Sequence, residues 1–217
     1  MSRKLTVIVV ALLLGAVTAV AAEQTVSVRP YLQFGRLMSA PSADDLGYED
    51  VDGASLEEYL DVDKGTMGGG AQLLFVVGPQ LKVGADLGFR KLYDSRFDTG
   101  ASDLDYIYES YQTDKESTIY LMGVAQYSLL DSPVFLQGGL GMHLVFWTWE
   151  KKHWSEYGRD DKESSDTEVG LGFMVAGGVN LPVHENLSFP IMLRIDYMFR
   201  HGSMIPVSLM AGASFNL

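Results

Sequence analysis

The stretch LSFPIMLRIDYMF, residues 187–199, decides the fold. Its odd-numbered positions are all apolar, whereas its even-numbered positions carry the polar residues, among them Arg194 and Asp196. Side chains alternate between the two faces of a strand, so this period of two predicts a strand with one wholly apolar face. The last segment, residues 205–217, repeats the pattern.

Six more two-faced segments precede these two, and no stretch between them favours a helix. They are residues 25–36, 67–76, 81–92, 117–128, 134–149 and 167–180. The connections fall into two sets that alternate along the chain. One set comprises residues 37–66, 93–116, 150–166 and 200–203, and the other comprises the short links 77–80, 129–133 and 181–186, which carry turn-forming Gly, Pro, Asp or Asn. Eight antiparallel strands joined in this way have all their long loops at one end.

Composition excludes several classes of function. The 217 residues include 28 Asp and Glu against 16 Lys and Arg, for a formal charge of -12, so a nucleic-acid backbone would be repelled. No cysteine is present, which excludes disulfides, thiolate metal sites and a cysteine nucleophile. We find no phosphate-binding loop, zinc motif or cofactor fingerprint, and therefore expect no cofactor and no bound metal.

The N-terminus has the features of an export signal. Arg3 and Lys4 precede an apolar run, and small residues follow at positions 18–22. We interpret residues 1–22 as a cleaved signal peptide and residues 23–217 as one β-barrel domain. An uncleaved membrane anchor is the alternative, because residues 5–22 are nearly long enough to span a bilayer.

A soluble eight-stranded barrel, such as a lipocalin, would also alternate polar and apolar residues. Its solvent face would be dense in Lys, Glu and Thr, but the polar faces here hold Gly, Ser, Gln, Met and a few isolated charges. A charge facing lipid near the midplane costs roughly 2–4 kcal/mol, so in a membrane barrel these residues must point inward. We predict a transmembrane up-and-down barrel with a lumenal polar network of Arg29, Lys82, Asp86, Arg90, His143, Arg194 and Asp196.

The eight two-faced strands, the alternating connections and the ending SLMAGASFNL, residues 208–217, resemble the small bacterial outer-membrane β-barrel family, which is porin-like and of the OmpA and OmpX type. The resemblance implies a Gram-negative outer membrane, with the tight turns in the periplasm and the long loops outside. It also implies contact with membrane lipid and lipopolysaccharide, and insertion by the outer-membrane assembly machinery.

Most of the acidic residues lie in the three longest connections. They could bridge divalent cations to lipopolysaccharide, or form a Ca²⁺ site around residues 61–65, but a solvated, self-repelling surface is the favoured interpretation because an EF-hand loop is incomplete. Aromatic residues gather at the same end. Trp147 and Trp149 are interpreted as an interfacial girdle or its lumenal neighbours, and the candidate residues for binding an extracellular partner are Tyr106, Tyr108, Tyr111, Trp154 and Tyr157.

Three functions are compatible with this pattern. We favour a non-enzymatic barrel that acts in surface interaction or envelope integrity. A small-solute or ion channel is the alternative, although eight strands leave an interior that side chains fill. A lipid A hydrolase ranks third: His201-Gly202-Ser203 resembles the His-x-Ser of lipid A deacylases, but residues 204–217 lack a carboxylate and only Glu168 could substitute for it.

Overall fold

The computed structural model describes residues 25–38, 60–100, 109–129, 132–155, 158–199 and 204–217. Within these residues, no helix is long and apolar enough to cross a membrane. The proposed signal peptide, residues 1–22, lies outside the described residues.

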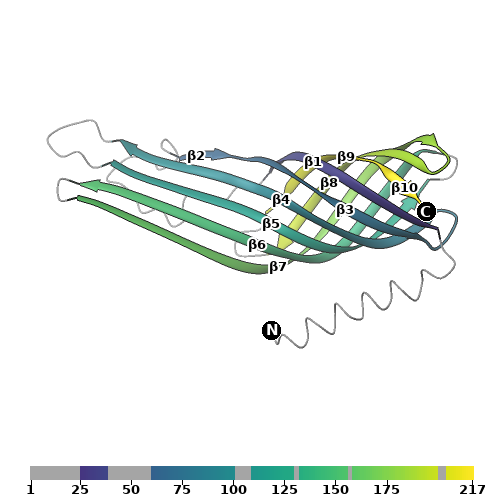
Figure 1. The fold of residues 1–217 in the computed structure, drawn as a ribbon, viewed down its shortest axis with the longest axis horizontal. Coiled ribbons are helices and arrows are strands. Elements are labelled where there is room, and N and C mark those ends of the chain that lie inside the picture. The colour runs from purple at the N-terminus through teal and green to yellow at the C-terminus, as the bar shows by residue number, and fades with distance from the viewer. Residues whose placement is uncertain (1–24, 39–59, 101–108, 130–131, 156–157, 200–203) are drawn as a thin grey trace, which may run out of the picture.

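The described residues form ten antiparallel strands in one sheet (Figure 1). They are β1 (Val26–Leu37), β2 (Leu60–Asp63), β3 (Gly65–Val76), β4 (Leu81–Gly100), β5 (Glu109–Ser128), β6 (Val134–Ser155), β7 (Gly158–His184), β8 (Leu187–Phe199), β9 (Pro206–Gly212) and β10 (Ser214–Asn216). Strands β9 and β10 occupy one position between β8 and β1, and β2 pairs only with β4. The remaining pairings close the sheet into a ring of eight, so the predicted eight-stranded antiparallel barrel is confirmed.

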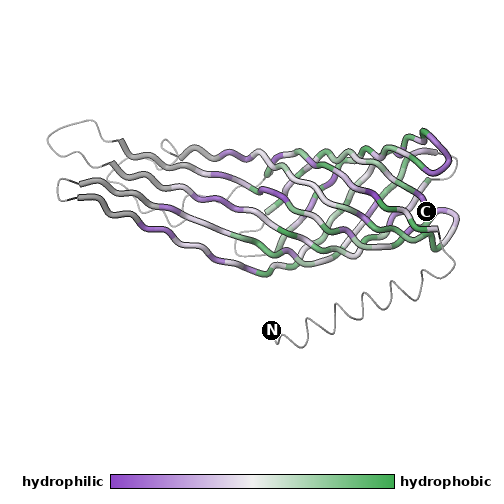
Figure 2. Tube along the Cα trace, viewed as in Figure 1, coloured by the Kyte–Doolittle hydropathy of each residue, from purple (hydrophilic) through white to green (hydrophobic). Residues whose placement is uncertain are grey.

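The barrel exposes apolar side chains and buries polar ones. On the outside, Leu140 is 72% exposed and Leu32 is 60% exposed, whereas Arg194 and Asp196 on the inside are fully buried. Burial alternates along β8 almost without exception, as the period of two predicts. The hydrophobic residues concentrate where the ring is closed (Figure 2). This inverted arrangement is that of a barrel whose outer face contacts lipid.

Two prolines flank the one interruption of the closing strand. Ala213 separates β9 from β10, and its backbone N–H donates to the carbonyl of Pro30 at 3.1 Å. Pro190 of β8 lies at the same level, because Ile191 pairs with Ala211 and Ser188 pairs with Ser214. Proline lacks the N–H that a continuous ladder needs, so both prolines occur where the neighbouring strand is irregular.

The strands extend further than the sequence predicts. Residues 93–116 and 150–166 are expected as connections, yet most of them belong to β4, β5, β6 and β7. Strand β2 was not expected, and β7 continues to His184, which shortens the link after it to two residues. Outside the hydrocarbon region neither face of a strand needs to be apolar. The alternation that identifies the membrane-spanning parts of these strands is therefore absent from their extensions.

Two glycines make room for a pair of tyrosines inside the barrel. Gly70 and Gly88 are register partners on β3 and β4, and both face the lumen beside the hydroxyl of Tyr31. A Cβ atom at Gly88 would lie 2.8 Å from the Tyr31 hydroxyl and closer still to the ring of Tyr120. At the level of Gly70 and Gly88, the lumen is therefore packed so closely that one added methyl group has no space.

We predict that Gly88→Ala destabilises the folded barrel by about 1–3 kcal/mol, the usual cost of overpacking a filled interior. Urea unfolding in lipid vesicles, followed by tryptophan fluorescence, measures the change. Gly78→Ala is the matched control, because a Cβ atom at Gly78 has nothing within 4 Å. Equal stability of the two variants would contradict a tightly packed lumen.

Candidate functional site

The centre of the lumen is a network of two arginines and two aspartates. The Arg194 guanidinium donates from Nη1 to Asp86 Oδ2 at 2.6 Å and from Nη2 to Asp196 Oδ1 at 2.7 Å. Arg90 Nη2 donates to Asp196 Oδ2 at 2.7 Å. All four side chains are at most 1% exposed. Because the four formal charges cancel, the network can persist in a low-dielectric interior.

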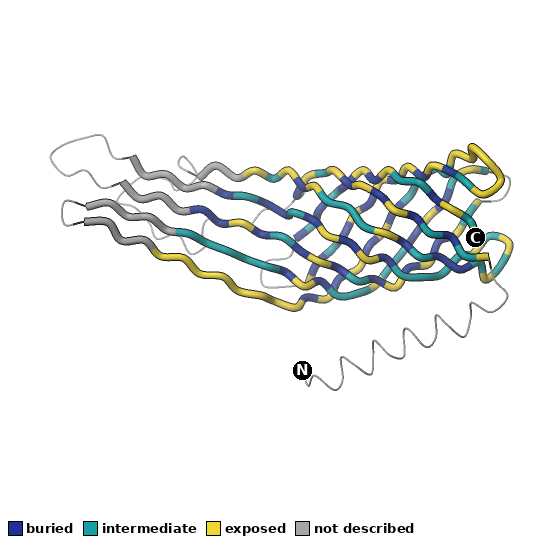
Figure 3. The backbone as a smooth tube through the Cα atoms, viewed as in Figure 1, coloured by how far each residue is buried: buried dark blue, intermediate teal, exposed yellow. Residues whose placement is uncertain are grey.

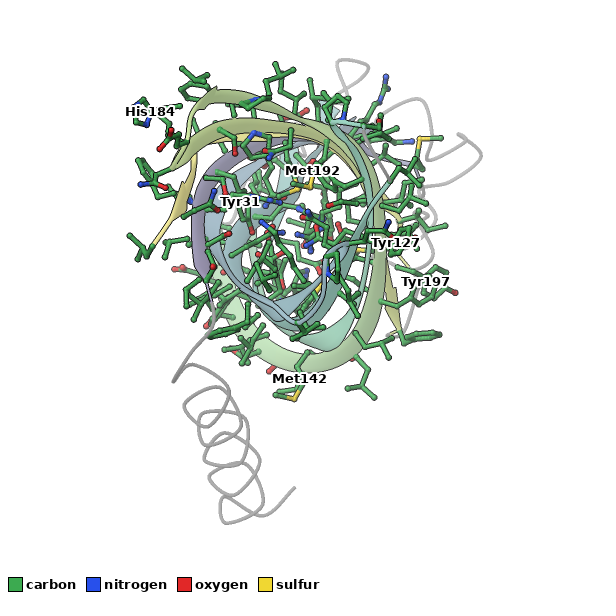
Figure 4. The ribbon with its side chains drawn as sticks, turned by 90° about the vertical axis from the view of Figure 1, so that its right-hand side faces the viewer. Tyr31, Tyr127, Met142, His184, Met192 and Tyr197 are labelled. Carbon is green, nitrogen blue, oxygen red and sulfur yellow. The ribbon has the colours of Figure 1, made fainter. Side chains whose placement is uncertain are left out.

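A directed chain of hydrogen bonds extends this network. The Tyr31 hydroxyl donates to Asp86 Oδ1 at 2.6 Å, so its oxygen is left to accept from the Tyr120 hydroxyl, also at 2.6 Å. Gln33 Nε2 then donates to the Tyr120 oxygen at 3.1 Å. The Arg194 guanidinium carbon lies 4.7 Å from the centroid of the Tyr120 ring. These contacts fix the side chains at the centre of the barrel, and Figure 4 shows side chains filling the interior.

The other predicted lumenal residues lie inside the barrel but outside this centre. Arg29 is fully buried and donates to two glutamine side chains, whereas Lys82 is half-buried and donates to Ser27 Oγ at 3.2 Å. His143 is buried against Tyr120, with ring centroids 5.8 Å apart. Neither ring nitrogen of His143 has a hydrogen-bond partner among the described residues.

Apolar side chains fill the lumen on both sides of the charges. One buried cluster contains four methionines, Met122, Met174, Met192 and Met210. A second cluster, towards the end where the strands are long, contains Leu37, Leu92, Tyr93, Val145, Met198 and Met204. Methionines on the even, otherwise polar positions are the sequence feature that could have revealed this filling, because flexible thioethers fill irregular gaps.

Four strands project beyond the ring at that end and are joined by β2. Pairing between β7 and β8 begins only at Leu171, so residues 158–170 of β7 pair with β6 alone in the described chain. On the opposite side, β2 covers residues 94–97 of β4. We call this extension, formed by β2 and the outer parts of β4–β7, the projecting sheet (Figure 1). It has one covered edge and one open edge, and the open edge is exposed (Figure 3).

Trp147 and Trp149 lie on the lumen-side face of the projecting sheet. They follow His143 and Val145 at intervals of two, and those two residues are buried inside the barrel. Trp147 is the register partner of Glu116 and Asp166. The interpretation of the two tryptophans as lumenal neighbours therefore holds, and an outward-facing girdle does not.

Most of the other predicted surface residues have either only their backbone or no atoms within the described part of the structure. Tyr111 and Trp154 belong to β5 and β6 rather than to loops, and their side chains are outside the described part. Tyr106, Tyr108 and Tyr157 lie outside the described residues, as does His201-Gly202-Ser203. Glu168 is exposed on β7.

The suggested Ca²⁺ site around residues 61–65 has its described carboxylate engaged within the protein. Asp63 Oδ1 accepts from the Gly65 backbone N–H at 2.9 Å, and Oδ2 lies 3.4 Å from Lys91 Nζ. The Gly65 N–H is the main cause that lowers the pKa of the Asp63 carboxyl, and Lys91 adds to it. Among the described residues, no three His, Cys, Asp or Glu side chains group in a way that could hold a metal.

Comparison with known proteins assigns the family. The model of the outer membrane protein beta-barrel domain matches residues 8–204. The chain therefore belongs to this family, and it is a protein of the bacterial outer membrane. Among curated proteins, no sequence matches it.

Solved structures with a similar fold include three bacterial proteins. The attachment invasion locus protein Ail of Yersinia pestis is 16% identical, with a TM-score of 0.45 and coverage of 90% of this chain and 99% of that one. Neisserial surface protein A is 14% identical, with a TM-score of 0.40 and coverage of 89% and 99%. OprG of Pseudomonas aeruginosa is 12% identical, with a TM-score of 0.37 and coverage of 89% and 96%. Ail has also been solved with the heparin analogue sucrose octasulfate.

We predict that Asp196→Asn destabilises the barrel by roughly 3–5 kcal/mol, because it removes one charge from the buried network and leaves Arg90 without a described carboxylate partner. Urea unfolding of the refolded protein in vesicles measures the loss. Asp63→Asn is the control, since its ion pair with Lys91 is exposed and should cost less than about 1 kcal/mol. A loss of the same small size in both variants would show that the lumenal pairs do not hold the barrel together.

Proposed function

We propose that the chain is a non-enzymatic outer-membrane barrel that presents the projecting sheet as a surface for binding an extracellular partner. The observation that carries the proposal is the unequal length of the strands. β6 and β7 have 22 and 27 residues, whereas β8 has 13. A tilted strand needs only about 9–11 residues to cross a bilayer, so the excess extends into the medium outside the cell.

The open edge of β7 supports this proposal. Over residues 158–170 its outward backbone N–H and C=O groups have no strand partner in the described chain. Unpaired edges add strands from other chains, and proteins restrain this with charged side chains. Lys162, Glu163, Asp166 and Glu168 stand along this edge. These charges guard the edge against uncontrolled pairing, while its outward backbone groups remain available to an extended segment of a partner.

The lumen-side face of the projecting sheet adds a second recognition element. Trp147 and Trp149 are partly exposed, and Trp147 is the register partner of the exposed Asp166 and of the buried Glu116. Indole rings beside carboxylates suit a cationic or carbohydrate-bearing ligand, because rings offer flat apolar area and attract cations. The same acidic surface suits bridging by divalent cations to neighbouring lipopolysaccharide, which would serve envelope integrity.

The lumenal polar network has a structural role in this proposal. Arg90, Arg194, Asp86 and Asp196 are fully buried, paired and surrounded by apolar clusters, so they act as a plug that stabilises the barrel. A route for solutes would require these pairs to separate. The filled interior favours surface interaction over the channel alternative.

We predict that a shortened β6–β7 hairpin abolishes surface binding and leaves the barrel intact. The variant replaces residues 151–162 with Asn-Gly, which joins the register partners Glu150 and Glu163 by a tight turn. Adherence of a non-adherent Gram-negative host that displays each form is measured on epithelial monolayers, on matrix-coated plates and between cells. Adherence should fall to the level of the empty host.

A matched control keeps the length of the hairpin and changes the other end of the barrel. Gly78→Ala lies in a tight turn with free space around it, so it should leave both adherence and folding unchanged. Heat-modifiable gel migration verifies that each variant has folded. Full adherence of a folded, shortened variant would refute the proposal.

We predict that the refolded wild-type barrel produces no discrete openings in planar bilayers, because the paired Arg194 and Arg90 close the lumen. Arg194→Ala should reduce heat resistance more than it raises ionic current. Gel migration run beside the recordings establishes that the protein is folded. Reproducible openings of the folded wild type would make transport the function instead.

A further inference from the structure

Arg29 is a fully buried cation without a carboxylate partner. Its Nη1 donates to the side-chain oxygens of Gln72 at 3.2 Å and Gln126 at 3.0 Å. Its guanidinium carbon lies 5.4 Å from the centroid of the Phe135 ring, and its Nε has no hydrogen-bond partner. Amides and a ring face stabilise a cation only partly. One buried donor of this charged group therefore remains unsatisfied.

A second cation lies beside it at the tight-turn end of the lumen. Lys82 is the register partner of Gln126, which accepts a hydrogen bond from Arg29, so the two cations are neighbours and repel each other. Lys82 Nζ donates to Ser27 Oγ at 3.2 Å, and the Ser27 hydroxyl donates to Asn216 Oδ1 at 2.6 Å. All the described hydrogen-bond partners of Lys82 and Ser27 are neutral or cationic.

The carboxylates of the lumen centre are already engaged. Asp196 binds Arg90 and Arg194, and Asp86 binds Arg194, Tyr31 and Gln72. The centre is thus neutral by itself. Asp86 acts on Arg29 through space and through Gln72, which hydrogen-bonds to both, but neither Arg29 nor Lys82 makes a described ion pair. A buried charge is costly unless an opposite charge compensates it.

We propose that the tight-turn end of the lumen binds a small monovalent inorganic anion, held by Arg29 Nε and Lys82 Nζ. The proposal is restricted to a single-atom ion, rather than a phosphate or sulfate, because Arg29 is fully buried and its guanidinium lies against the Phe135 ring. Lys82 is half-buried and marks the side of entry, the barrel end that faces the viewer in Figure 4.

The test compares chloride with gluconate at constant ionic strength. Gluconate is too large for the site, so only chloride should raise the unfolding midpoint of the refolded barrel, by about 2–4 °C and with saturation. Line broadening in ³⁵Cl nuclear magnetic resonance measures binding directly. Folded wild-type protein should broaden the chloride line, and added bromide should reverse the broadening by competition.

Variants assign the effect to the two cations. Arg29→Gln and Lys82→Met should each lose the chloride-specific rise of the unfolding midpoint and the broadening of the chloride line. If Arg29→Gln does not fold, Lys82→Met alone tests the proposal. Lys115→Met is the control, because Lys115 is exposed on β5 in the projecting sheet and should leave both readouts unchanged. Equal stabilisation of the wild type by chloride and gluconate would overturn the proposal. So would an undiminished chloride response in the folded Lys82→Met variant.

Discussion

Closure of the sheet between β1 and the pair β9 and β10 is the constraint on which the rest of the structure depends. Backbone groups in hydrocarbon must find partners within the protein, so a sheet can span a membrane only as a ring without edges. Here the closing ladder runs from Ser27 to Leu37 of β1, with one interruption opposite Pro30. Because Pro30 and Pro190 lie on either side of Ala213, the donors that these two prolines lack are missing at the same level of the ring. The other described irregularities in strand pairing occur at residues 91–93 of β4 and 182–184 of β7.

Closure also determines what the interior must be. Eight strands enclose a space that side chains fill, so any charge directed away from lipid meets other side chains rather than bulk water. The charge of Arg194 is compensated by Asp86 of β4 and Asp196 of β8. At Gly70 and Gly88, the absence of a side chain leaves space for the hydroxyls of Tyr31 and Tyr120. Charge pairing and the placement of glycines together allow the side chains to fill the interior.

The sequence predicts the part of the fold that lipid dictates. Alternation in residues 187–199 identifies β8 with its exact bounds, and the charged residues on even positions are placed inside by the cost of exposing them to hydrocarbon. The pairing of Arg90 with Asp196 could not be read, because residues 106 positions apart meet only through the stagger of a closed barrel. The outer parts of β4–β7 were not predicted as strands, because Ser, Thr, Lys and Glu occur on both of their faces, as they do in a loop. Nothing in the sequence indicates that the ring nitrogens of His143 lack hydrogen-bond partners among the described residues.

The projecting sheet follows from strand lengths that are unequal around the ring. The long strands β4–β7 are consecutive, so the extension rises from one side only and must end in two edges. One edge is covered where β2 pairs with residues 94–97 of β4, and the other, residues 158–170 of β7, has no partner strand in the part of the chain that the structure describes. A barrel that served only to span the membrane would gain nothing from strands beyond the bilayer, and an open edge carries a risk of aggregation. The charges along β7 restrain that risk without removing the edge, and this combination is expected of a surface kept available for a partner.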